Sequence, residues 1–69
     1  MPVVAYLLLC PASEQPQIRK RLASKRNLAI GDSNERGIAI AVSAPQQQAV
    51  ETIERWLTTL PGVRAVVPV

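Results

Sequence analysis

Residues 37–43 read GIAIAVS, and this stretch decides the fold because its side chains alternate between two kinds. Ile38, Ile40 and Val42 are bulky and branched, whereas the residues between them are small. Such alternation is typical of a β-strand with one face in a core and the other face uncovered. The sequence therefore predicts that Ala39 and Ala41 point away from the core.

A second stretch, VVAYLLLC over residues 3–10, predicts another strand that is apolar on both faces, as central strands usually are. We expect the polar tip of Tyr6 to point outward, because it is easier to hydrate on an uncovered face. The residues that would then face the core are Ala5, Leu7 and Leu9. The residues that would point outward are Val4, Tyr6, Leu8 and Cys10.

A helix is expected after each of these strands. The first would begin near Ser13 as its N-cap, with Ile18 and Leu22 on its buried side. The second would begin after Ser43, which fits a capping box with Gln46. The apolar stripe of the second helix comprises Val50, Ile53, Leu57 and Leu60.

Two weaker strands, at residues 27–32 and 63–67, complete the pattern, and turn-forming residues at 32–37 predict a hairpin. The order is β-α-β-β-α-β. Short connections and right-handed crossovers then predict one α+β domain over residues 1–69, a ferredoxin-like two-layer sandwich with an antiparallel sheet in the order 4-1-3-2. Both helices would cover the same face of the sheet.

The other face of that sheet is the candidate site. On the last strand we expect Arg64 and Val66 to point outward. The predicted lining of the uncovered face is Val4, Tyr6, Leu8, Ala39, Ala41 and Val66. A contiguous apolar patch of this kind usually marks an interaction surface. The central alanines predict a shallow trough, which either holds an amphipathic helix or stacks against a second copy in a homodimer.

The composition argues against an enzyme. The chain has no histidine and one cysteine, so the usual zinc ligands and most acid–base schemes are missing, and we expect no catalytic residues, no metal site and no cofactor. The net charge is +3, and residues 19–26 hold five of the eight cations. We interpret this cluster as a solvated helix face rather than a nucleic-acid site, because Tyr6 is the only aromatic residue on the predicted strands.

The location of the protein is predicted from its first residues. Residues 3–10 are too short to span a bilayer, and Met1-Pro2 lacks the basic region that precedes the apolar part of a secretory signal. We therefore expect a cytoplasmic protein that does not insert into membranes.

Several short motifs occur in an order and spacing that resemble one known family. They are the first strand closed by Pro11, Gly31-Asp32 before the hairpin, GIAIAV at 37–42, and LPGV at 60–63 before a hydrophobic strand. The chain resembles the NapD family of small cytoplasmic chaperones for periplasmic nitrate reductase. The resemblance implies a ferredoxin-like fold and a non-enzymatic role: binding the twin-arginine signal peptide of a precursor on the open sheet face and delaying export until the molybdenum cofactor is inserted. The residues that it would place at the peptide are Val4, Tyr6, Leu8, Ala39 and Ala41.

Two other classes share the motif Pro61-Gly62-Val63 before a last strand. One is the ACT-type regulatory domain, which binds a small molecule at a dimer interface. The other is the subtilisin propeptide, whose C-terminal segment, here Arg64 to Val69, would enter a protease cleft. Both remain alternatives to the chaperone interpretation.

Overall fold

The computed structural model describes residues 3–69 of the chain. Its elements are β1 (Val3–Leu9), a short 3₁₀ helix η1 (Ala12–Glu14), α1 (Gln15–Ala23), β2 (Leu28–Ser33), β3 (Gly37–Ser43), α2 (Gln47–Leu57) and β4 (Ala65–Pro68). The predicted α+β class, with a four-stranded antiparallel sheet and two helices, is confirmed. Met1 and Pro2, which carry part of the argument about a secretory signal, lie outside the described residues.

The strands form one sheet in the order β2-β3-β1-β4, which is β4-β1-β3-β2 when read from the opposite edge. All three neighbouring pairs are antiparallel. The central pair, β1 with β3, is in register over seven residue pairs, from Val3 opposite Ser43 to Leu9 opposite Gly37. Both edges are therefore formed by the shorter strands.

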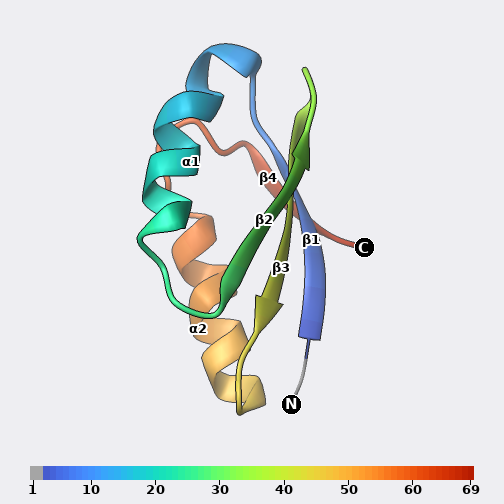
Figure 1. The fold of residues 1–69 in the computed structure, drawn as a ribbon, viewed down its shortest axis with the longest axis vertical. Helices are drawn as coiled ribbons and strands as arrows, with labels where there is room; N and C mark the ends of the chain where they lie inside the picture. The colour runs from blue at the N-terminus through green and yellow to red at the C-terminus, as the bar shows by residue number, and fades with distance from the viewer. Residues whose placement is uncertain (1–2) are drawn as a thin grey trace.

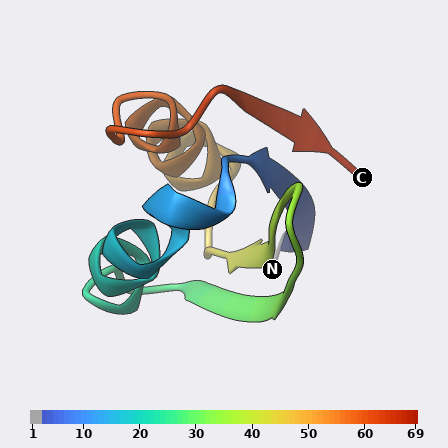
Figure 2. The same ribbon diagram turned by 90° about the horizontal axis from the view of Figure 1, so that it is seen from above.

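The molecule has two layers. Both helices lie on the same side of the sheet, with the β-strands forming the second layer (Figure 1). Seen from above, neither of the two helices described within residues 3–69 covers the other side of the sheet (Figure 2). We call this uncovered side the open face.

The core fills the space between the two layers. The alternation in β3 is confirmed, since Ile38, Ile40 and Val42 are buried. The apolar sides of the helices meet these residues, with Ile18 and Leu22 from α1 buried as expected. From α2 and the turn after it, the buried residues are Val50, Ile53, Leu57 and Leu60.

The predicted helix caps are wrong. Ser13 lies within η1, and α1 begins after Glu14 with Pro16 in its first turn, where a missing N–H costs no intrahelical bond. Ser43 is the last residue of β3, and α2 begins only after Gln46, without a side-chain cap. The pairing of Ser43 with Val3 keeps this serine in the sheet, so the helix starts four residues later.

The hairpin between β2 and β3 is built around Asn34. Its Oδ1 accepts hydrogen bonds from the backbone N–H groups of Arg36 at 2.8 Å and Gly37 at 3.2 Å. Gln15, at the start of α1, is buried, and its Nε2 donates to the carbonyl oxygens of Asn34 at 2.6 Å and Cys10 at 3.3 Å. The hairpin is thus tied to the helix layer by a buried amide.

Candidate functional site

The open face consists of the residues that alternate with the core residues along each strand. The pairing places Leu7 opposite Ala39 and Val67, and Ala5 opposite Ala41. Because directly opposite residues share a face, these side chains lie together on the uncovered side. The pairing places on this side Ala5, Leu7, Leu9, Ala29, Gly31, Ala39, Ala41, Ala65 and Val67, with Val3 opposite Ser43 at one end. Except for Ser43, these residues are apolar or glycine.

The predicted orientation of β1 is wrong. Tyr6 is opposite Ile40, and both are buried, with 2% and 3% of their surfaces exposed. Leu8 is fully buried, Cys10 is buried, and Val4 packs against the core. Leu7 and Leu9, which we expected in the core, are therefore on the open face instead.

The orientation of β4 is wrong for the same reason. Val66 is opposite Leu8 and packs against the core, whereas Val67, opposite Leu7, is 40% exposed. Of the six residues predicted to line the open face, only Ala39 and Ala41 lie there. The other four, which face the helix layer, are Val4, Tyr6, Leu8 and Val66.

The partner of Tyr6 explains why the expectation about its orientation failed. The Tyr6 hydroxyl donates a hydrogen bond to Glu54 Oε2 of α2 at 2.9 Å, so the phenol is satisfied without water. Burial raises the pKa of Tyr6 from 10.0 to about 12, with the Glu54 hydrogen bond and charge acting in the same direction. Tyr6 is thus a neutral core residue under ordinary conditions.

The open face is hollowed between β2 and β3. A depression of about 240 Å³ is lined by Ala29, Ile30, Gly31, Ala39, Ile40 and Ala41. Beside it, β1 carries the larger side chains Leu7 and Leu9, which are both half-buried. The face is therefore a floor of small residues next to a ridge of leucines. An apolar helix fits this floor and ridge better than it would fit a flat surface.

The pairing of the strands decides which residues line the open face, and the sequence alone did not show this. The functional candidates missed by sequence reasoning are Leu7, Leu9, Ala29, Gly31 and Val67. Leu7 and Leu9 could have been found by placing Tyr6 on the bulky face of β3 rather than on the face of Ala39. The only signal for that choice is that a buried tyrosine hydroxyl needs a partner, which Glu54, beside the apolar stripe of the second helix, could have supplied.

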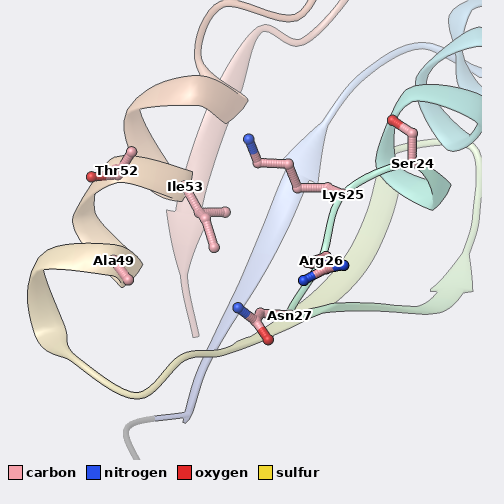
Figure 3. A pocket seen from close by; sticks show the side chains of 7 residues that line it. All are labelled: Ser24, Lys25, Arg26, Asn27, Ala49, Thr52 and Ile53. Atoms are coloured by element: carbon pink, nitrogen blue, oxygen red, sulfur yellow. The ribbon is translucent and has the colours of Figure 1, made fainter.

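A second hollow of about 540 Å³ lies between the end of α1 and the first half of α2 (Figure 3). It is lined by Ser24, Lys25, Arg26, Asn27, Ala49, Thr52 and Ile53. Several polar groups here already have partners. Ser24 Oγ donates to the Arg21 carbonyl at 2.7 Å, and Thr52 Oγ1 donates to the Gln48 carbonyl at 3.0 Å.

Lys25 in this hollow is also engaged with the protein. Its Nζ lies 4.6 Å from the centroid of the Trp56 ring, within the range of a cation–π interaction. Trp56 therefore packs at the edge of the core and holds the segment after α1 against α2. The hollow between the helices is better explained as a packing groove than as a ligand site.

The third hollow, of about 520 Å³, lies on α2 among Glu51, Glu54, Arg55 and Thr58. Thr58 Oγ1 donates to the Arg55 carbonyl at 2.6 Å, and Glu54 accepts from Tyr6. Acidic and basic groups are mixed here, and the side chains of Glu54 and Thr58 already hydrogen-bond within the protein. This surface offers no group of one chemical kind that would select a ligand.

Cys10 has the environment of a structural residue. It is buried, its Sγ lies 3.6 Å from the Leu8 carbonyl oxygen, and burial raises the pKa of the thiol. A backbone hydrogen bond from Ile38 acts in the opposite direction and is the smaller effect. A raised pKa favours the thiol over the reactive thiolate.

Within residues 3–69, no group of three or more metal-ligating side chains comes together. None of the helices in this part of the chain is both long enough and apolar enough to cross a membrane. The chain matches no protein-family model, and neither a curated protein nor a solved structure shows significant similarity to it.

Proposed function

We propose that this chain is a non-enzymatic binding protein of the ferredoxin-like class, whose open face takes an apolar helical segment of another protein. The βαββαβ order, with both helices on one side of an antiparallel sheet, supports the fold class. The function rests on the open face itself.

One observation carries the proposal: the uncovered side of the sheet is mainly apolar, with a hollow floored by Ala29, Gly31, Ala39 and Ala41 beside the Leu7–Leu9 ridge. A contiguous exposed apolar patch on a small domain usually marks an interaction surface. In helix-in-groove recognition, an amphipathic helix places its apolar side in a hydrophobic groove. The hollow beside the Leu7–Leu9 ridge has this form.

The resemblance to the NapD family suggests the kind of occupant. We propose an assembly chaperone in the cytoplasm that binds the twin-arginine signal peptide of a periplasmic nitrate reductase precursor. The placement of the cations favours this, because Arg19, Lys20 and Arg21 lie on α1, on the other side of the sheet from the open face. A peptide with two arginines would therefore not meet the basic helix.

The proposal is tested with a dye-labelled synthetic peptide that has two consecutive arginines followed by an apolar stretch. Binding is measured by fluorescence anisotropy for the wild type and for Ala39→Arg, which fills the hollow. We expect the variant to weaken binding roughly tenfold or more, about 1.4 kcal/mol. Its stability should stay within about 0.5–1 kcal/mol of the wild type, because Ala39 is not in the core.

Ala23→Arg is the matched control, since it makes the same change at an exposed position on α1. Its affinity should equal that of the wild type. Equal affinity of Ala39→Arg and the wild type would refute the open face as the binding site. A tight dimer that ignores the peptide but is broken by Ala39→Arg would show instead that a second copy covers this face, as in an ACT-like domain.

A further inference from the structure

Strand β2 contains a β-bulge next to the hollow of the open face. Ile30 is opposite Ile40 and Ser33 is opposite Ile38, so two residues of β2, Gly31 and Asp32, face the single residue Ala39 between them. A bulge of this kind inserts one extra residue into a strand and re-aims its side chain.

The flanking residues show to which side Asp32 is directed. Ile30 packs against the core, and Ser33 Oγ accepts a hydrogen bond from the Arg19 guanidinium of α1 at 3.1 Å. Both residues therefore face the helix layer. The two residues between them lie on the opposite side, and so the exposed Asp32 belongs to the open face, beside Gly31 and Ala39 of the hollow.

Asp32 is the only charged residue in the four strands of residues 3–69. The other acidic residues lie in helices or in the hairpin turn. Within residues 3–69, the strands that form the docking surface thus carry one charge, a carboxylate beside the hollow.

We infer that Asp32 is a specificity-determining residue, which pairs with a basic side chain of the helical segment that docks on the open face. This inference rests on the proposed function. Burying a carboxylate under an uncharged apolar ligand is unfavourable, because the charge loses water without gaining a partner. A ligand with an arginine at this place restores the lost interactions through charge-assisted hydrogen bonds. One carboxylate therefore favours cationic apolar helices over neutral ones.

A charge and a bulge on an edge strand have another common role, which is to prevent edge-to-edge pairing with a second copy. The two roles make different predictions. Edge protection concerns the oligomeric state and is indifferent to the charge of a bound peptide, whereas recognition depends on that charge.

The test is a double-mutant cycle with two synthetic apolar helical peptides of about 16 residues, a length of about 24 Å that matches a seven-residue strand. One peptide carries a single arginine at the border of its apolar face, and the other carries citrulline, which is neutral and of the same shape. Each is titrated against the wild type, Asp32→Asn and Glu51→Gln at low salt. Glu51→Gln removes the same charge from an exposed site on α2 and is the matched control.

We expect the wild type to bind the arginine peptide about three- to fivefold more tightly than the citrulline peptide, the range of an exposed ion pair. Asp32→Asn should abolish this preference, and Glu51→Gln should keep it.

The same preference in Asp32→Asn as in the wild type would overturn the inference while leaving the proposed function intact, provided that Ala39→Arg still blocks binding. Dimerisation of Asp32→Asn without any change in peptide preference would also overturn it and assign Asp32 to edge protection. Failure of both peptides to bind the wild type would overturn the proposed function, and the inference with it.

Discussion

The side chains of Tyr6 and Glu54, 48 residues apart in the chain, are joined by a hydrogen bond of 2.9 Å between the phenol and the carboxylate. This bond connects the central strand β1 to the helix α2 across the edge of the core. It lets a tyrosine point inward and so directs Leu7 and Leu9 to the open face. The orientation of the proposed binding surface thus depends on a contact within the opposite layer.

The pH dependence of folding should report this contact. Because the pKa of Tyr6 is raised from 10.0 to about 12 by burial and by Glu54, its contribution to stability is complete below about pH 10. The contribution is lost as the pH rises through about 12. Urea unfolding followed by Trp56 fluorescence should therefore show a steeper fall between pH 10 and 12 for the wild type than for Tyr6→Phe. Identical pH profiles of the two proteins would contradict the assignment.

Truncation of the core should be costly in both layers. Leu57 of α2 is fully buried and Ile40 of β3 is 3% exposed. Leu57→Ala and Ile40→Ala should each lower the free energy of unfolding by about 2–5 kcal/mol, a large share of the stability of a small domain. Gln48→Ala, at an exposed position of α2, should change it by less than about 0.5 kcal/mol. A cost below about 1 kcal/mol for either core variant would argue against the described packing.

Two glycines of the sheet should respond differently to the same substitution. A Cβ at Gly37 would collide with the Leu8 carbonyl of the central strand β1, and this backbone cannot yield without disturbing the sheet. A Cβ at Gly31 would lie 3.3 Å from the Ala39 carbonyl oxygen, which needs a shift of only a few tenths of an ångström.

We therefore expect Gly37→Ala to destabilise the protein by about 1–3 kcal/mol or more, and Gly31→Ala to have a much smaller effect. Thermal unfolding followed by circular dichroism measures both. If the two variants melt at the same temperature, the close approach of β3 to β1 at Gly37 is not as described.

The basic cluster on α1 should not form a nucleic-acid site. Arg19, Lys20 and Arg21 are exposed on the helix layer, and Lys25 stacks on Trp56. Single-stranded nucleic acid is usually bound by cations together with several stacking aromatics, which the strands do not provide. A titration with single-stranded RNA at physiological salt should show no specific binding. Sub-micromolar binding that disappears in Lys20→Glu and Arg21→Glu, with the steep salt dependence of phosphate contacts, would reverse this conclusion.

Strand β3 illustrates what could be predicted. Its alternation of branched and small residues allows only one orientation of the strand toward the core. A one-residue shift would bury the small residues and expose Ile38, Ile40 and Val42. The apolar stripe of α2 is equally unambiguous because its spacing matches one side of a helix. The order of elements follows from these patterns, and Ala39 and Ala41 were correctly placed on the open face.

Strand β1 illustrates what could not be predicted from the sequence. VVAYLLLC is apolar on both faces, so hydrophobicity by itself does not choose between Tyr6 and Leu7 for the core. The hydration argument failed because it treated the hydroxyl as needing water, whereas Glu54 supplies a partner inside the protein. The helix starts were missed for a related reason, because Ser13 and Ser43 are suitable caps in sequence but are held in η1 and β3 by their neighbours.

The sequence by itself determined the order and type of the four strands and the two α-helices, because the periodicity of apolar residues is a local property; the short helix η1 was not predicted. Only the tertiary structure decided which side chains of β1 and β4 lie on the open face. Strand pairing sets that choice, through Tyr6 opposite Ile40 and Val66 opposite Leu8. It also decided the direction of Asp32, since a bulge exists only when two strands pair unequally, and no single strand contains that information.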